Sequence, residues 1–321
     1  MKKLYAIFAL ILAVAFVLTA CGSAPTPAPT EAPAPTQVAP TQAPPTATAV
    51  PDLLATIKAR GYMLVSTDPN YAPQSSLNTS GKRPSDTKCP SDALTSAEMQ
   101  GFDVDVAAEL AKRLGVEVCF ATPSWDAITA GSWADKWDIS VGSMTITPER
   151  QKVLYFTTPY YYTPATVAVR KDANITSLDQ LSGQSLCVGT STTYEDWLNG
   201  KLDLPANDIL AQPPTNVKVV SLDTDQECAQ AIQSGRKDFV GYVTSDTVVN
   251  SNLANGLAVV KVGGAVYVED LAVAIDKSHT LDATSLVSTL DGFVKDMHSD
   301  GTLSSLSMKW FQVDLTQTPQ H

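Results

Sequence analysis

Several polar residues stand directly after apolar segments of strand type, where ligand-binding groups of α/β proteins collect. Arg150 follows a Thr-Pro-Glu turn beyond one such segment, and its planar guanidinium suits two-pronged capture of a carboxylate. Gly142, Ser143 and Thr145 lie just before it and offer carbonyl, hydroxyl and amide groups. The alternative for Arg150 is a surface arginine in a salt bridge, and the residues alone leave both readings open.

A second group of polar residues begins an expected helix. Thr192 and Thr193 follow the strand pattern of residues 186–190. Thr192 and Glu195 also have the spacing of a capping box. Because the first N–H groups of a helix are free and its dipole favours negative charge, the two threonines are candidates for contact with an anion. Plain capping is compatible with that role.

Metal and covalent sites find little support in the sequence. The three histidines, His279, His298 and His321, are widely spaced, and neither HExxH nor CxxC occurs, so no zinc ligand set is predicted. The P-loop pattern and the G-x-S-x-G elbow are also missing from the sequence. We interpret Asp103 and Asp105 as helix-start residues rather than a catalytic acid pair. Neither a metal nor a cofactor is expected.

The elements that must position these residues belong to a large acidic protein. Of 321 residues, 44% are apolar and 17% charged, which suffices for packed cores and suggests about two domains. The formal net charge is −11, and removing Lys2 and Lys3 with the first 20 residues makes it −13. Nucleic acids and anionic membrane surfaces require a basic footprint, so neither is an expected partner.

Residues 1–20 have the pattern of a secretory signal peptide. A positively charged start precedes an uncharged, mostly apolar run over residues 4–18. The segment ends in Leu-Thr-Ala followed by Cys21, which fits the bacterial lipobox, so we expect Cys21 to be lipidated after cleavage. An ordinary signal peptide and an uncleaved anchor helix are the alternatives.

Residues 21–51 form an expected tether. They contain nine of the 21 prolines and a single charged residue, Glu31. Such a segment favours extended polyproline II chain at ~3.1 Å per residue, enough to hold a domain up to about 90 Å from a membrane. We therefore place the protein on the outer face of the bacterial cytoplasmic membrane, in an oxidising space. A docking site for proline-reading modules is the alternative.

Four cysteines remain once the lipobox cysteine is set aside, and they allow three pairings. Cys89 and Cys119 flank the first expected strand–helix unit, whereas Cys187 and Cys228 lie about a hundred residues later. We predict the structural disulfides Cys89–Cys119 and Cys187–Cys228. A catalytic thiol would need a nearby base, and no histidine falls between residues 52 and 278.

The rest of the chain alternates strand and helix patterns, which indicates parallel sheets covered by helices. Strands are expected at residues 62–67, 116–120, 137–142, 154–157, 186–190, 217–222, 239–243, 258–262 and 271–275. Helices are expected from Gly101 to Leu114, after Ser124, after Thr192, from Asp223 to Ile232, and over 285–298 and 303–311.

Seven segments of the chain form a distinctive series in their order and spacing. They are 101–107 (GFDVDVA), 138–150 (DISVGSMTITPER), 155–161 (YFTTPYY), 178–183 (LDQLSG), 235–238 (GRKD) and the closing pair 300–302 (DGT) and 309–311 (KWF). In this arrangement residues 52–314 resemble the family 3 extracellular solute-binding proteins, the polar amino-acid receptors of ABC importers. The resemblance implies an α/β, two-lobed periplasmic-binding-protein-like fold, with two mixed sheets flanked by helices and joined by two hinge strands.

Carried over to this chain, lobe 1 comprises residues 52–164 and 267–321, and lobe 2 comprises residues 165–266. The lobes would close on a ligand like a hinge. Family members use the strip of Gly142, Ser143 and Thr145 for the ammonium and carboxylate of the solute, which makes Arg150 a carboxylate ligand rather than a surface arginine.

The resemblance also assigns aromatic residues. Tyr71 and Trp125 match positions where the family places the walls of the binding site, although aromatic residues at such positions are as often part of a core. Trp133 and Trp137 are interpreted as structural, because Trp137 precedes a buried strand pattern.

One departure from the family concerns the ammonium contact. Members place an acid about five residues after the aspartate of the G-R-x-D element, whereas the first acid after Asp238 is Asp246, eight residues on. Either the strand carries extra residues and Asp246 receives the ammonium, as we expect, or the contact is altered.

The resemblance implies a monomeric, lipid-anchored receptor that binds an amino acid or similar small polar solute and delivers it to the permease subunits of an ABC transporter. The alternative is an enzyme on the same fold, such as a dehydratase acting on a carboxylated ring acid. That reaction needs a general acid or base in the cleft, and lobe 2 contains no histidine and no clear acid pair.

Overall fold

The computed structural model describes residues 51–318. The predicted signal peptide, the lipidation site Cys21 and the tether up to residue 50 lie outside the described residues. Within residues 51–318, no helix combines the length and apolar character needed to cross a membrane. The same part of the chain has no group of three or more His, Cys, Asp or Glu side chains placed to hold a metal ion.

Helices and strands alternate along most of the chain, as the sequence patterns predict. The helices are α1 (Leu53–Arg60), α2 (Phe102–Leu114), α3 (Trp125–Thr129), α4 (Arg150–Val153), α5 (Thr193–Leu198), α6 (Asp225–Gln233), α7 (Asp246–Ala254), α8 (Thr284–Ser299) and α9 (Thr302–Phe311). The strands are β1 (Tyr62–Ser66), β2 (Asn70–Tyr71), β3 (Ser75–Leu77), β4 (Leu94–Thr95), β5 (Met99–Gln100), β6 (Glu117–Ala121), β7 (Ile139–Thr145), β8 (Leu154–Phe156), β9 (Tyr161–Arg170), β10 (Ser185–Gly189), β11 (Lys218–Leu222), β12 (Gly241–Ser245) and β13 (Val259–Asp276).

Ten of the strands form one mixed sheet, and β2, β3 and β5 form a small second one. The main order is β11-β10-β12-β9-β13-β7-β1-β6-β4, with β8 added beside β13. Parallel strands lie at both sides, and the antiparallel pair β9 and β13 joins them in the middle. The α/β class with two crossing strands is therefore confirmed. The two expected sheets are hydrogen-bonded into one, because β9 and β13 pair from Tyr161 to Arg170.

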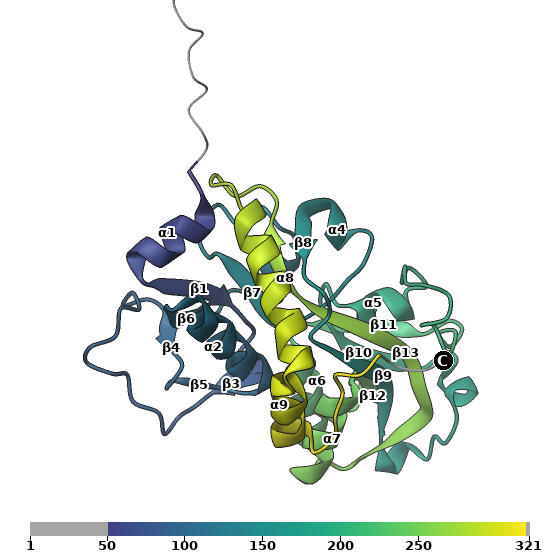
Figure 1. The fold of residues 1–321 in the computed structure, drawn as a ribbon. Coiled ribbons are helices and arrows are strands. Elements are labelled where there is room, and N and C mark those ends of the chain that lie inside the picture. Colours follow the sequence, from purple (N-terminus) through teal and green to yellow (C-terminus); the bar gives the residue numbers. More distant parts are fainter. Residues whose placement is uncertain (1–50, 319–321) are drawn as a thin grey trace, which may run out of the picture. The chain divides into compact units, whose positions relative to one another are not determined.

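The apolar side chains gather in separate cores on the two sides of this central pair. We call the part built on the first core (Leu53 to Tyr161 and Leu271 to Leu303) the first half, where α1, α2, α8 and α9 pack over β1, β6 and β7 (Figure 1). The second half, residues 165–267, has cores on both faces of its strands, since Leu186 and Val188 face α5 while Cys187 faces α6. Such two-sided burial explains the nearly continuous apolar runs of these strands.

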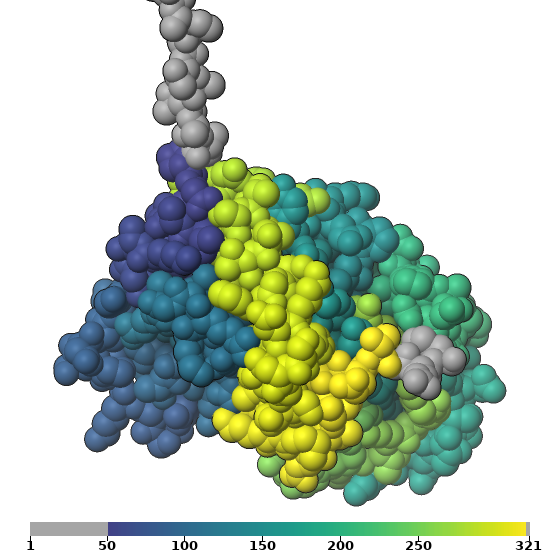
Figure 2. Space-filling model, viewed as in Figure 1, coloured from purple at the N-terminus to yellow at the C-terminus, as the bar shows by residue number. Residues whose placement is uncertain are grey.

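The C-terminal helices run along one face of the molecule. Figure 2 shows α8 and α9, in yellow-green and yellow, as a continuous ridge on the first half, and the chain after α9 then crosses towards the second half. In this crossing Tyr162 donates its backbone N–H to the carbonyl of Leu315, at 2.8 Å. The C-terminal segment therefore touches the chain where β9 begins.

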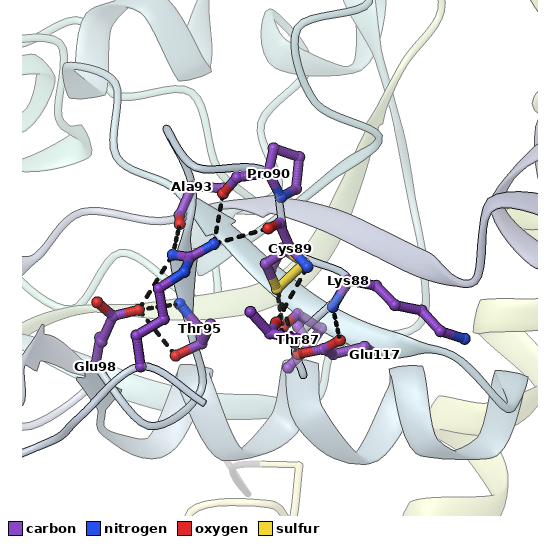
Figure 3. A network of polar contacts seen from close by, with 11 residues as sticks. Thr87, Lys88, Cys89, Pro90, Ala93, Thr95, Glu98 and Glu117 are labelled. Carbon is purple, nitrogen blue, oxygen red and sulfur yellow. Dashed lines mark hydrogen bonds and ion pairs between the residues drawn. A yellow bond between two sulfur atoms is a disulfide. The ribbon is translucent and has the colours of Figure 1, made fainter. Parts of the chain in front are cut away.

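Both disulfides have the predicted partners. Cys89–Cys119 ties the long connection between β3 and β5 to β6, and Cys187–Cys228 joins β10 to α6. Arg83 belongs to the same connection and stabilises its conformation, because its guanidinium donates to the carbonyls of Cys89, Pro90 and Ala93 at 2.6–2.7 Å (Figure 3). This connection is therefore held in place by a covalent bond and a half-buried guanidinium.

Two stretches differ from their sequence patterns. The strands expected at 258–262 and 271–275 are parts of one continuous strand, β13, which contains Gly263 and Gly264. Both glycines have positive φ, 76° and 73°, and the pairing register with β9 shifts there, so the apolar pattern breaks while the strand continues. In addition, the cap of α6 is Thr224, which accepts the Glu227 N–H, one residue after the expected Asp223.

Candidate binding site

The carboxyl ends of parallel strands from both halves meet around one cavity. β1, β6 and β7 reach it from the first half, and β10 and β11 from the second. About 440 Å³ of space among its walls is not filled by atoms, part of it open to solvent. The residues that line it are Asp68, Tyr71, Trp125, Gly142, Ser143, Thr145, Arg150, Gly189, Thr192, Thr193, Tyr194, Asp223, Thr224, Asp225 and Glu269.

The structure brings together all but one of the binding residues that the sequence analysis proposed. The cavity is lined by Tyr71, Trp125, Gly142, Ser143, Thr145, Arg150, Thr192 and Thr193. These residues come from segments up to 122 positions apart, so their convergence depends on the strand order. Trp133 and Trp137 lie away from the cavity, buried together against Ile128 in a core beside α3.

Asp246 is not part of the cavity, and the expectation for it is wrong. The additional residues after Asp238 keep β12 in the sheet through Ser245, so Asp246 becomes the first residue of α7. There it accepts hydrogen bonds from the Lys261 ammonium (2.5 Å) and the Thr166 hydroxyl (2.9 Å). Its carboxylate therefore serves an ion pair beside β9 and β13.

Arg150 is a buried cation that forms no direct ion pair with the residues the structure describes. The residue is 7% exposed, and its guanidinium donates to the carbonyls of Thr145 (3.0 Å) and Ser191 (3.1 Å). Among the ion pairs of residues 51–318, none includes Arg150. Burial lowers the pKa of this guanidinium, while the negative charges of Glu269 and Asp196 act in the opposite direction. A surface arginine in a salt bridge is therefore excluded.

The aromatic walls reach across the cavity to the other half. Tyr71 and Tyr194 join their hydroxyls at 2.9 Å, and the Trp125 indole N–H donates to the Ser191 carbonyl at 3.2 Å. The Arg150 guanidinium lies 5.6 Å from the centroid of the Trp125 ring. Ser191 has the left-handed backbone conformation, with φ of 61°, which is uncommon for a residue with a Cβ. The halves are thus in direct contact at this edge.

A buried acid, Asp103, holds one of the residues that line the cavity, Ser143. Asp103 accepts hydrogen bonds from the hydroxyls of Ser143 (2.7 Å) and Tyr160 (2.8 Å), and Tyr160 in turn accepts the Ser143 N–H (2.9 Å). Burial raises the pKa of Asp103 to about 7. Asp103 begins α2 as predicted, and it also fixes the position of Ser143.

The second half contributes Asp225, from the first turn of α6. This carboxyl is 5% exposed and accepts the Gly189 N–H (2.7 Å) and the Thr244 hydroxyl (2.9 Å). A Cβ at Gly189 would lie 2.6 Å from the same carboxyl oxygen, so only glycine allows this approach. Burial, with repulsion from Asp68 and Glu269, raises the pKa of Asp225 to about 7.

Glu269 supplies a further acid from β13, the central strand. It is 1% exposed, and its carboxylate accepts three hydroxyls: Thr145 and Thr193, each at 2.7 Å, and Tyr194 at 2.8 Å. Burial raises the pKa of Glu269, while the three hydroxyls and the positive charge of Arg150 act in the opposite direction.

The helix start at Thr192 is organised differently from the expected capping box. The Thr192 hydroxyl accepts the Glu195 N–H (3.2 Å) and donates to the Gly189 carbonyl (2.7 Å). The Glu195 carboxylate instead accepts the N–H of Ser191 (2.8 Å). One half of the box therefore forms, and its other half shifts by one residue to hold the strained Ser191.

Sequence reasoning missed the acids of the cavity. Asp68 stands in a turn after β1 and Asp225 in the first turn after β11, both at carboxyl ends of strands where the rule for α/β sheets could have found them. Glu269 is the acid of the apolar run 265–275 that reaches the cavity. A carboxylate in such a run is costly to bury, and that cost is a signal of function.

The arrangement suits a small molecule that carries both charges. Arg150 offers donors for a carboxylate, and Asp225 offers acceptors for an ammonium. Both kinds of group are buried, so each exerts a stronger electrostatic effect than it would in water. Trp125 and Tyr71 add apolar surface beside them.

Comparisons with known proteins agree with this geometry. The family described as bacterial extracellular solute-binding proteins, family 3, matches residues 85–313. The L-cystine-binding protein TcyJ of Escherichia coli (strain K12) is 30% identical over 83% of this chain and 88% of its own. The ABC transporter arginine-binding protein 1 of the same strain is 31% identical over 67% of this chain and 82% of its own.

Solved structures with the same fold have similar levels of identity. The ancestral amino acid-binding protein AncCDT-1, described as a precursor of cyclohexadienyl dehydratase, is 31% identical, with a TM-score of 0.64 over 80% of this chain and 99% of that chain. An ancestral arginine-binding protein bound to arginine is 28% identical, with a TM-score of 0.63 over 78% and 98%. Because the family match spans more than half of the sequence, the chain belongs to the family 3 bacterial extracellular solute-binding proteins.

Proposed function

We propose that this protein captures an α-amino acid outside the cytoplasm and delivers it to the permease of an ABC transporter, held to the membrane by a lipid on Cys21. The relatives named for L-cystine and arginine support an amino acid as the solute. The lipid anchor is supported by the lipobox that ends at Cys21. The chain would act as a monomer.

The buried Arg150, which forms no direct ion pair within residues 51–318, carries the proposal. A guanidinium that is 7% exposed and hydrogen-bonded to neutral carbonyls has lost water without gaining a carboxylate in direct contact, which is unfavourable unless a ligand supplies one. An α-carboxylate has the charge and the planar shape that this guanidinium requires. We therefore assign the carboxylate of the solute to Arg150.

The ammonium of the solute is assigned to Asp225 in place of Asp246. Asp225 belongs to the second half and lines the same cavity as Arg150, and its two oxygens accept hydrogen bonds from Gly189 and Thr244. A carboxylate fixed by two donors can still accept hydrogen bonds from an ammonium, because each oxygen has two lone pairs. The two charges of an amino acid would then join the two halves.

We propose that the halves move as the two lobes expected from the sequence, residues 52–164 with 267–321 and residues 165–266. Their separate hydrophobic cores support rigid-body motion, and β9 and β13, which connect them, are the natural hinge. The direct contacts of Tyr71 and Trp125 with the other half correspond to a closed arrangement.

No covalent step is part of the proposal. Asp225, with its pKa near 7, is the one observation that favours a dehydratase, since a general acid works best near the ambient pH. However, both of its oxygens are engaged with Gly189 and Thr244, as expected for a fixed electrostatic partner. Incubation with a carboxylated ring acid should leave its ultraviolet spectrum unchanged.

Calorimetric titration with L-cystine, L-arginine and L-histidine tests the assignment of Arg150. Replacing Arg150 with Ala should weaken the binding of whichever amino acid the wild type binds by roughly 2–5 kcal/mol, as for other buried charge pairs, or about 30-fold or more. Arg236→Ala is the matched control, because Arg236 pairs with Asp238 on the surface. Equal losses in the two variants would contradict the assignment.

A further inference from the structure

Glu269 occupies an unusual place for a carboxylate. It belongs to the strand that connects the two halves, it is 1% exposed, and its hydrogen-bond donors are neutral hydroxyls. A buried carboxylate costs free energy unless donors compensate it. The compensation here depends on residues from both sides of the cavity.

The donors of Glu269 come from the two halves. Thr145, at the end of β7, belongs to the first half, and Thr193 and Tyr194, in the first turn of α5, belong to the second. Because Tyr194 donates its single proton to Glu269, Tyr71 must donate its own proton to the Tyr194 hydroxyl. The hydroxyls of Tyr71 and Tyr194 therefore form a chain of hydrogen bonds that all donate towards the Glu269 carboxylate, and each bond strengthens the next.

Opening the halves would break this network. If α5 moved away, Glu269 would keep only Thr145 among these donors, and the link between Tyr71 and Tyr194 would separate. Two contacts of this edge do not involve Glu269. The Trp125 indole N–H and the Ser191 carbonyl are both neutral, so their hydrogen bond is weaker than one to a charged group, whereas the Arg150 guanidinium also donates to the Ser191 carbonyl.

We propose that Glu269 is a positioning residue that stabilises the closed arrangement of the halves before any solute binds. This inference rests on the proposed closure of two lobes. Glu269 raises the fraction of molecules in the closed arrangement, which is the form that holds a solute. The affinity for every solute should therefore rise by the same factor. A residue that contacted the side chain of the solute would instead affect some amino acids more than others.

The exchange of the Trp125 indole N–H with water, measured by NMR on the full chain without solute, tests this directly. The signal is assigned with Trp125→Phe, and it reports closure because the N–H donates across the cavity to Ser191. Glu269→Gln, which keeps the shape but loses the charge, should speed the exchange about tenfold or more, since hydrogen bonds to a charged group are lost. Tyr194→Phe should give a smaller increase.

Asp276→Asn is the matched control. Asp276 is also a buried carboxylate of β13, but it accepts hydrogen bonds from Trp133 and Ser278, which both belong to the first half. In the Asp276→Asn variant the Trp125 N–H should therefore exchange at the wild-type rate. Unchanged exchange in both Glu269→Gln and Tyr194→Phe would overturn the proposal.

A second readout separates this inference from the proposed function. Glu269→Gln should weaken L-cystine, L-arginine and L-histidine by the same factor for those that the wild type binds, and leave their ranking unchanged. A loss confined to one solute would overturn the positioning role and make Glu269 a contact residue. Because the NMR result needs no solute, it stands even if none of the three amino acids binds.

Discussion

Burial raises the pKa values of the acids in and beside the cavity. Asp225 and Asp103 have pKa values near 7, and burial is the main cause in both. Asp103 has the hydroxyls of Ser143 and Tyr160 as donors, whereas Asp225 faces the space where a solute would lie. The two acids therefore have similar pKa values in different surroundings: Asp103 holds Ser143 in place, and Asp225 is the proposed ligand of the solute ammonium.

This pKa predicts how binding depends on pH. An ammonium beside Asp225 favours its charged form and lowers its pKa below the value of about 7 in the free protein. Binding then releases a proton wherever the pH lies between these two values. The affinity for an α-amino acid should therefore fall up to tenfold per unit as the pH drops below about 7, and level off above it.

Calorimetry between pH 5.5 and 8 measures this dependence, because neither charged group of an amino acid titrates in that range. Asp225→Asn should bind more weakly at pH 8 and lose most of the pH dependence. Asp238→Asn, which alters a surface carboxylate paired with Arg236, should behave like the wild type. A wild-type affinity that is constant with pH would be inconsistent with an ammonium at Asp225.

At the scale of elements, the ends of strands were the most predictable feature. The candidates at 142–150 and 192–193 could be found because parallel strands present their carboxyl ends at one edge. Asp246 could not be placed, because the sequence does not say at which residue β12 ends and α7 begins. The continuity of β13 through Gly263 and Gly264 was equally hidden, since a bulge interrupts the apolar pattern without ending the strand.

The disulfides give a prediction at the same scale. Removing Cys187–Cys228 through a double alanine variant should lower the free energy of unfolding by about 4 kcal/mol, from the loop that the bond closes, as measured by urea titration. It should also weaken solute binding, because this bond joins β10 to α6, whose ends bring Gly189 to Asp225.

The Cys89–Cys119 pair provides the comparison. It closes a loop of similar length, with a separation of 30 residues against 41. However, it joins the connection between β3 and β5 to β6, and neither cysteine lines the cavity. Its removal should lower the free energy of unfolding by a similar amount and leave the affinity unchanged. An equal loss of affinity in the two double variants would show that the effect comes from stability alone.

At the scale of the whole molecule, the cavity lies between two halves that share one sheet. The proposed ligand of the solute carboxylate, Arg150, belongs to the first half, and the proposed ligand of its ammonium, Asp225, belongs to the second. A zwitterionic solute held in this way would connect the halves, which links binding to closure. The central pair β9 and β13 joins the two halves within one sheet.

The anchor is a separate property of the whole chain, and it is tested by membrane fractionation. Cys21→Ser should release the protein from the membrane fraction or leave its precursor unprocessed, because the lipid would have no attachment site. Thr19→Ser, a change within the same segment, is the control and should remain membrane-bound. Normal cleavage with full membrane retention of Cys21→Ser would contradict lipidation.

Native mass spectrometry of the freshly purified protein tests the central claim most directly. A receptor that encloses its solute between two halves retains part of it during purification. We predict an added mass that equals that of an amino acid, lost in Arg150→Ala and retained in Arg236→Ala. An added mass without a carboxylate and an amine, or one that persists in Arg150→Ala, would contradict the assignment of this cavity to an amino acid.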